Sequence, residues 1–225
     1  MGFFQSALII AKKDLALELR GKEIVTTSVF FAILTILMFG FAFDMAQADG
    51  RHFAAGGLWV AILFSGALTM NRSFLYEKEN DCLSAILLAP LDRSSIYFGK
   101  MGANFALMLV AEAFIVPVST VIFNVNIMER FLPQLAVLLL GTLGFISVGT
   151  LVAAMSVNLR AREMLGPLLT LPVVAPALIA SVEISSGLIG GEGMEQLMVW
   201  YKILVAFDLV YLVAPWLVFE KLVEQ

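Results

Sequence analysis

Residues 24–43 read IVTTSVFFAILTILMFGFAF and contain no charged side chain. A helix of this length is long enough to cross the hydrocarbon core of a bilayer, which requires about 20 apolar residues. Ala46 and Ala48 follow in an A-x-A pattern of the kind found at signal-peptide cleavage sites. The apolar run is longer than the core of a signal peptide, however. We therefore predict an uncleaved first membrane-spanning helix.

Five further stretches have the same character, and together the six cover residues 24–43, 53–70, 98–123, 131–157, 164–186 and 197–219. Lipid offers no water to backbone groups, and these runs lack the alternation of barrel strands, so each is predicted to be a helix. Of the 225 residues, 60% are apolar and 14% charged, which is more apolar surface than a soluble domain can hide. The predicted fold is an all-α integral membrane protein, with one transmembrane permease domain over residues 1–225.

The basic residues indicate how the chain is oriented. Three of the 14 Lys and Arg residues fall on one predicted side, namely Arg51, Arg130 and Lys202, and the rest fall on the other side. Cytoplasmic loops are the ones enriched in Lys and Arg, so this bias predicts that both chain ends are cytoplasmic.

Residues 3–22 are predicted to form an amphipathic helix lying along the membrane surface. An apolar stripe recurs at spacings of three or four, at Phe4, Leu8, Ala11, Leu15 and Leu19. The expected wet face consists of Lys12, Lys13, Asp14, Glu18 and Arg20. Such a helix can rest in the interfacial plane or against a partner, and Gly21 is expected to end it.

The longest predicted connection, residues 71–97, is cytoplasmic. Asp81 is a candidate N-cap of a short helix with an apolar patch, and Pro90 would end that helix. The patch consists of Leu83, Ile86 and Leu87 and follows the acidic residues Glu77 and Glu79. A short amphipathic helix of this kind fits a groove on a soluble partner. The alternative is a solvated loop that only reverses the chain.

These residues also carry a family resemblance. Glu77, Glu79, Leu83, Ile86, Leu87, Pro90, Gly99 and Lys100 stand in an order that resembles permease subunits of the ABC-2 class of ATP-binding-cassette exporters. Within that class the chain resembles, over nearly its whole length, the haem exporter permeases, which are the B subunits of the cytochrome c maturation system. The stretches 74–79 and 87–90 and the proline-rich fifth span contribute to this resemblance.

The resemblance implies a partnership. Residues 3–22 would be the connecting helix, and residues 77–91 the coupling helix that contacts an ABC ATPase subunit. The other implied partners are the haem-handling C and D subunits and a periplasmic haem chaperone, in the bacterial inner membrane. ABC permeases need two membrane halves, so a homodimer or a pairing with another permease is expected. Haem would be handled by the complex and ATP bound by the partner subunit.

The chain itself lacks a phosphate-binding loop. Gly21-Lys22 and Gly99-Lys100 have neither the upstream glycine nor the following Ser or Thr. We therefore expect a non-catalytic subunit whose energy comes from elsewhere.

Three acidic residues fall inside the predicted spans: Glu112, Glu183 and Asp208. An ionisable group at membrane depth is costly and faces protein or water. Each of the three is a candidate for a polar pathway or an inter-helix contact needed for substrate handling. For Glu183 and Asp208, near the ends of their spans, we favour the alternative that they reach the interface. Glu112 is in mid-span, where that alternative does not apply.

Prolines and glycines mark two other spans. Pro167, Pro172 and Pro176 predict that the fifth span is kinked or broken, either as a moving part or as a static bend. In the fourth span, Gly141, Gly144 and Gly149 would permit close helix packing. Residues 187–196, which contain Gly187, Gly190, Gly191 and Gly193, are predicted to form a flexible outer loop.

Cys82 and His52 are the only residues of their kinds, so several cysteines or imidazoles of this chain cannot share a metal or a haem. We expect no metal or cofactor on this chain alone, and we interpret His52 as an interfacial side chain. Two functional alternatives stay open: an ABC-2 exporter of a lipid, glycan or drug, and an ion-driven secondary transporter that uses Glu112. The second alternative also includes a membrane scaffold that works without an ATPase. A membrane-embedded enzyme is disfavoured because no nucleophile and base stand out.

Overall fold

A computed structural model describes residues 2–42, 50–79, 93–127, 129–156 and 162–222. These residues form seven helices, and no strand is found among them. The helices are α1 (Phe3–Gly21), α2 (Glu23–Ala42), α3 (Gly50–Glu79), α5 (Arg93–Phe123), α6 (Phe131–Ser156), α7 (Arg162–Ile189) and α8 (Met194–Leu222).

Six helices of the described chain, all except α1, are long and apolar enough to cross a membrane. The predicted all-α membrane fold with six spans is therefore confirmed. The helices extend beyond two of the predicted spans, since α3 continues to Glu79 and α5 begins at Arg93. Residues 71–79 contain neither Gly nor Pro and include good helix formers, so the helix continues past the apolar run.

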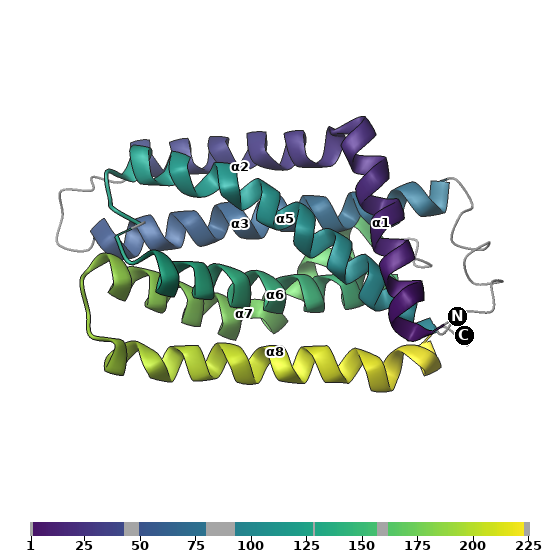
Figure 1. The fold of residues 1–225 in the computed structure, drawn as a ribbon. Coiled ribbons are helices and arrows are strands. Elements are labelled where there is room, and N and C mark those ends of the chain that lie inside the picture. Colours follow the sequence, from purple (N-terminus) through teal and green to yellow (C-terminus); the bar gives the residue numbers. More distant parts are fainter. Residues whose placement is uncertain (1, 43–49, 80–92, 128, 157–161, 223–225) are drawn as a thin grey trace.

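The six spans run side by side, and α1 crosses them at one end of the bundle (Figure 1). Both chain ends are at this same end, as are the last turns of α3 and the first turns of α5. We call it the α1 end. An even number of spans returns the chain to the side from which it started, which agrees with this placement.

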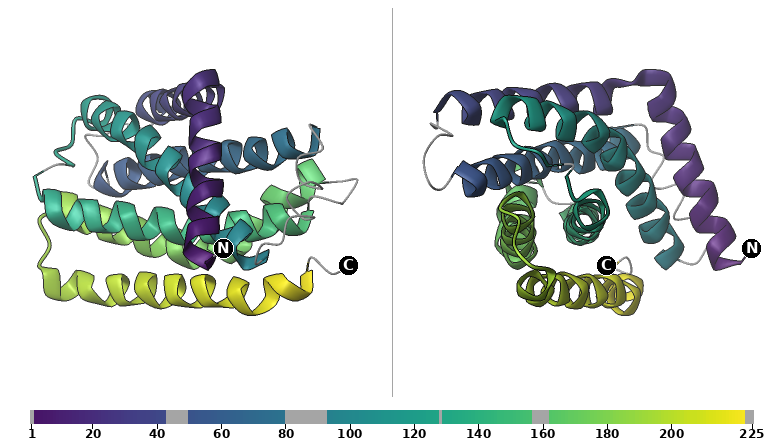
Figure 2. Two further views of the ribbon diagram at one scale, coloured as in Figure 1. Left: turned by 45° about the vertical axis from the view of Figure 1, so that its right-hand side comes forward. Right: turned by 60° about the vertical axis from the view of Figure 1, so that its left-hand side comes forward.

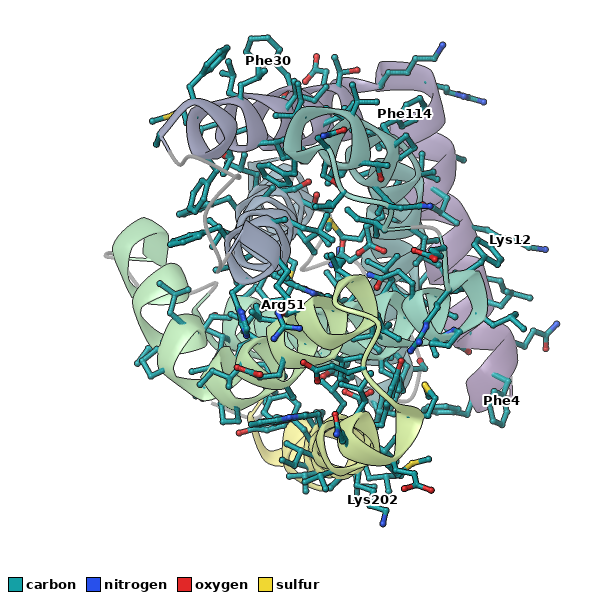
Figure 3. The ribbon with its side chains drawn as sticks, turned by 90° about the vertical axis from the view of Figure 1, so that its left-hand side faces the viewer. Phe4, Lys12, Phe30, Arg51, Phe114 and Lys202 are labelled. Atoms are coloured by element: carbon teal, nitrogen blue, oxygen red, sulfur yellow. The ribbon has the colours of Figure 1, made fainter. Side chains whose placement is uncertain are left out.

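Helix α3 is at the centre of the bundle, where it contacts α2, α5, α6 and α7 (Figure 2). In its spanning stretch 67% of the residues are buried, against 22% in α2 and 17% in α8. The outer surface is apolar: Phe30 and Phe114 stand at the rim of the bundle and are more than half exposed (Figure 3). Such a surface suits lipid rather than water.

The three glycines of α6 lie at close helix contacts, as predicted. A Cβ atom at Gly141 would lie 2.4 Å from a ring carbon of Trp59 in α3. A Cβ at Gly149 would lie 2.2 Å from the sulfur of Met70, and one at Gly144 would lie 2.6 Å from Oδ1 of Asp208 in α8. A larger residue at these positions would force the neighbouring side chain to move, which is hardest at Gly141 because the neighbour there is the rigid ring of Trp59.

Helix α7 runs without interruption past Pro167, Pro172 and Pro176. The prolines predicted a helix that is either kinked or broken. A break is wrong, and the helix is instead visibly bent (Figures 2 and 3). Each proline removes only its own donor, so a membrane helix can continue where local adjustment satisfies the freed carbonyl groups.

Candidate functional site

The predicted coupling residues mostly lie outside the described residues. Glu77 and Glu79 belong to the last turn of α3, although the structure describes only their backbone. Asp81, Leu83, Ile86, Leu87 and Pro90 fall within residues 80–92, outside the described chain. Their role as a partner-binding segment stays a prediction.

What the structure does describe is the helix that follows this segment. The first turns of α5 pack directly against α1, and the two backbones approach closely at Gly99. A Cβ atom there would lie 2.8 Å from the carbonyl oxygen of Ala7 and 2.8 Å from the Cβ of Ile10. The rings of Phe3 and Phe98 extend the contact, with centroids 5.7 Å apart. Glycine is therefore required at position 99 by the approach of α1.

An ion pair stands next to this contact. The Nζ atom of Lys100 lies 3.3 Å from Oδ2 of Asp14, and the side chain of Lys100 is only 1% exposed. Asp14 is 11% exposed and also lies 3.2 Å from Nζ of Lys13. Charges removed from water attract each other more strongly than surface charges do. No pattern in the sequence indicated this partner for Lys100, and the structure shows what it contacts.

A second contact joins α1 to α2. Oε1 of Glu18 accepts a hydrogen bond from the backbone N–H of Val25, at 2.9 Å. Between the helices Lys22 has a left-handed backbone, with φ of 56°, and its N–H donates to the carbonyl of Glu18. Helix α1 ends at Gly21, as predicted, and the left-handed residue Lys22 follows it. Glu18 thus satisfies a donor in the first turn of α2, which has no partner inside its own helix.

The faces of α1 were predicted partly wrongly. Asp14 and Glu18 were expected on the wet face, but both point into the bundle, where Lys100 and the Val25 amide satisfy them. Phe4 and Leu8 are 85% and 55% exposed, and Phe4 and Lys12 both point outward (Figure 3). The first part of the apolar stripe, at Phe4 and Leu8, therefore faces away from the bundle and is available to a membrane surface, whereas Ala11 and Leu15 are half-buried. Burial of a polar side chain is tolerated when it has a partner, which periodicity alone does not reveal.

At the opposite end of the bundle, two arginines hold the connection between α7 and α8. Nη1 of Arg51 lies 3.1 Å from Oε1 of Glu192. Arg130 donates to the carbonyl oxygens of Gly191 and Glu192. His52, next to Arg51, is half-buried. In the sequence these arginines indicated only how the chain is oriented.

The glycines of this connection form a helix cap at the end of α7, and the predicted flexibility of the connection stays a prediction. Gly191 has a φ of +75°, and its N–H donates to the carbonyl of Leu188. The N–H of Glu192 donates to the carbonyl of Gly187. This pair of bonds is the Schellman motif, which glycine favours because it lacks a Cβ.

The interior contains the candidate acids. Glu112 in α5 is 3% exposed, and its Oε1 accepts a hydrogen bond from the hydroxyl of Thr142 in α6. Glu183 in α7 is half-buried. Asp208 was expected to reach the interface, and this is wrong: it is 4% exposed and lies against Gly144. It is on the inward face of α8, which continues well beyond it to Leu222.

Comparison with known proteins gives a consistent result. The family model described as CcmB protein matches residues 5–221. A protein named Heme exporter protein B from Paracoccus denitrificans is 29% identical over 194 residues, covering 85% of this chain and 87% of that protein. Its namesake in Bradyrhizobium diazoefficiens is 26% identical over 208 residues, covering 92% of this chain and 91% of that protein. A third, from Rhodobacter capsulatus, is 25% identical over 185 residues, covering 82% and 84%. No solved structure matches the chain.

Proposed function

The chain belongs to the CcmB protein family, and from this premise we propose that it is the membrane subunit of a haem exporter that serves cytochrome c biogenesis. In this proposal a separate ABC ATPase subunit hydrolyses ATP. The membrane subunit couples that hydrolysis to haem export, or to release of a haem-loaded periplasmic chaperone. The names of the relatives and their coverage of nearly the whole chain support the proposal.

The observation that carries the mechanical role is the fastening of α1 to both α5 and α2. The segment 77–91 would receive the stroke of the ATPase, and α3 and α5 flank it. A displacement of the first turns of α5 carries α1 with it, because Lys100 binds Asp14 and α1 packs on Gly99. Helix α1 in turn moves α2 through the bond from Val25 to Glu18. A displacement of segment 77–91 would thus be transmitted to α3, α5, α1 and α2.

The proposal places the chain in the bacterial inner membrane with both ends in the cytoplasm. The α1 end then faces the ATPase, and the end held by Arg51 and Arg130 faces the periplasm. The apolar faces of α2 and α8 would meet lipid, a second copy of the chain, or the C and D subunits that handle haem. No ATP site is expected on this chain, which would act as a non-catalytic subunit.

Co-purification with the candidate ATPase tests the coupling role. Wild type is compared with Glu79→Arg and with the double variant Leu83→Asp/Ile86→Asp, all in native membranes solubilised in mild detergent. We expect wild type to retain the ATPase and both variants to lose it while still inserting. Glu195→Arg is the control, because it reverses an exposed acid in the first turn of α8, away from the α1 end.

Retention of the ATPase by all variants would remove the coupling segment from the proposal. Failure of inserted wild type to bring down any ATPase would favour gradient-driven transport. A further arm addresses the substrate: the reconstituted complex should release the haem-loaded chaperone only with hydrolysable ATP. ATPase binding without such release would leave an ABC-2 exporter of another substrate.

A further inference from the structure

Helix α1 turns both of its acidic residues into the bundle. The Asp14 carboxylate lies 3.3 Å from Nζ of the buried Lys100, and the Glu18 carboxylate accepts from the Val25 amide. Asp14 is 11% exposed and Glu18 is 7% exposed. The negative charges of α1 are therefore satisfied inside the protein and contribute little to its outer surface.

The basic residues of the same segment stay on the outside. Lys12 and Arg20 are exposed, and so is Lys22, the residue that follows the helix. The side chain of Lys13, which pairs with Asp14, is 39% exposed. The next exposed acid along the chain is Glu23, the first residue of α2. Because its acids face inward, the outer surface of α1 is basic.

Large apolar side chains lie on this outer surface beside the cations. They are between 41% and 85% exposed: Phe4, Leu8, Ile9 and Leu17. Such side chains gain nothing from water, whereas the boundary between headgroups and acyl chains can accommodate them. Apolar anchors combined with Lys and Arg are typical of helices that bind the surface of an anionic bilayer.

The depth of α1 relative to the spans agrees with the headgroup layer. The apolar stretch of α5, Ser94–Phe123, has 30 residues and is about 45 Å long, which equals a bilayer with both headgroup layers. Helix α1 packs on Gly99, about 8 Å from the start of that stretch. The other end of α1 leads directly into α2, whose uncharged run begins at Ile24.

The direction of the exposed side chains also favours lipid. In a view along the spans, Phe4 and Lys12 point sideways, away from the other helices (Figure 3). Sideways from a membrane-spanning bundle, at the depth of the headgroups, lie phospholipids. Ammonium and guanidinium groups donate charge-assisted hydrogen bonds to phosphate oxygens, and a guanidinium can do so with two parallel bonds.

We propose that the outer surface of α1 binds anionic phospholipid headgroups, with Lys12, Arg20 and Lys22 as the phosphate-binding residues and Phe4 and Leu8 as apolar anchors. Lipids with a net negative charge, such as phosphatidylglycerol, are selected over zwitterionic lipids, because no acid of α1 offsets the exposed cations. The binding requires neither haem nor ATP and is independent of the proposed coupling role.

Tryptophan fluorescence of the full chain in proteoliposomes tests this selectivity. Phe4→Trp places an indole on the outer surface of α1, and the emission of the unaltered chain, with three tryptophans, is subtracted. The vesicles contain equal parts of phosphatidylglycerol and phosphatidylcholine, and only one of the two carries bromine on its acyl chains. Bromine quenches an indole that it contacts. We expect a preference for phosphatidylglycerol of at least about fivefold, the effect of one basic side chain near an anionic surface.

Two changes should reduce this preference. Lys12→Gln/Arg20→Gln should lower it by at least about threefold, because two cations are removed. Salt at about 1 M should lower it as well, since the screening length falls to about 3 Å. Lys202→Gln is the matched control: it removes an exposed, outward-pointing lysine from α8, which begins at the opposite end of the bundle (Figure 3).

Equal quenching by the two brominated lipids in the Phe4→Trp chain would overturn the proposal and favour an acidic protein segment as the partner of this surface. Quenching by neither lipid would overturn it too, because α1 would then not contact the bilayer. An unchanged preference in Lys12→Gln/Arg20→Gln would remove these cations from the site. Leu8→Trp, at a position 55% exposed, repeats the measurement if Phe4→Trp does not insert.

Discussion

Lys100 and Asp14 lie 86 residues apart in the sequence, yet the Lys100 ammonium is 3.3 Å from the Asp14 carboxylate. The pair joins the first helix of the chain to the helix that follows the predicted coupling segment. Because Lys100 is almost completely buried, the contact differs from an ordinary surface ion pair, which contributes little. Its geometry makes it the first target for mutagenesis.

Lys100→Met should destabilise the protein by about 1.5–3 kcal/mol, because it leaves the largely buried Asp14 carboxylate paired only with the more exposed Lys13. Asp14→Asn/Lys100→Met should recover much of that loss, since neither charge remains. Thermal unfolding in detergent micelles measures both. Additive losses in the double variant would show that the two side chains do not interact.

Gly99→Ala should destabilise the contact between α1 and α5 by about 1–3 kcal/mol, because the added Cβ meets the Ala7 carbonyl oxygen. Gly102→Ala is the matched control on the same helix, where nothing lies within 4 Å of the new Cβ. The control should be neutral or stabilising by about 0.5–1 kcal/mol, the usual helical preference for Ala over Gly. Cross-linking of cysteines placed in α1 and α5 reports the displacement. Equal effects of the two variants would contradict the close approach.

Glu18→Ala should raise the hydrogen-exchange rate of the Val25 amide, because its acceptor is lost. The expected cost is about 1.5 kcal/mol, typical for a hydrogen bond to a charged group. Glu18→Gln keeps an oxygen acceptor and should show a smaller effect. Glu23→Ala removes an exposed acid from the first turn of α2 and serves as control. Unchanged exchange at Val25 in Glu18→Ala would rule out this bond.

Gly191→Ala should destabilise the end of α7 by about 1–2 kcal/mol, because an L-residue is strained at positive φ. No atom lies within 4 Å of the added Cβ, so the effect is conformational and not steric. Gly193→Ala, also in open space, should change the unfolding temperature much less. Indistinguishable unfolding temperatures for the two variants would argue against the left-handed cap.

The orientation predicted from the basic residues can be checked on intact cells. In the Cys82→Ser background, Gln196→Cys and Gln5→Cys place thiols at exposed positions on opposite ends of the bundle. A membrane-impermeant maleimide should label position 196 in whole cells and position 5 only after the cells are broken. The reverse pattern would invert the topology. The physical basis is the bias of Lys and Arg toward the cytoplasmic side.

Sequence reasoning succeeded where a single physical rule decides the outcome. The 20 residues of α2 are apolar without interruption, and lipid leaves a helix as the only way to satisfy their backbone. The close packing at Gly149 followed from the small size of glycine. Asp208 was misjudged because distance from the end of a span does not reveal which way a side chain faces.

By itself, the sequence determined the six spans and the family, because the hydrophobic length of a helix and the order of residues are local properties of the chain. Tertiary structure alone decided that Asp14 meets Lys100, that Glu18 meets Val25, and that Phe4 and Leu8 of α1 face away from the bundle. These contacts join distant parts of the chain. Which buried polar group finds a partner depends on how the helices pack, and no periodicity records that choice.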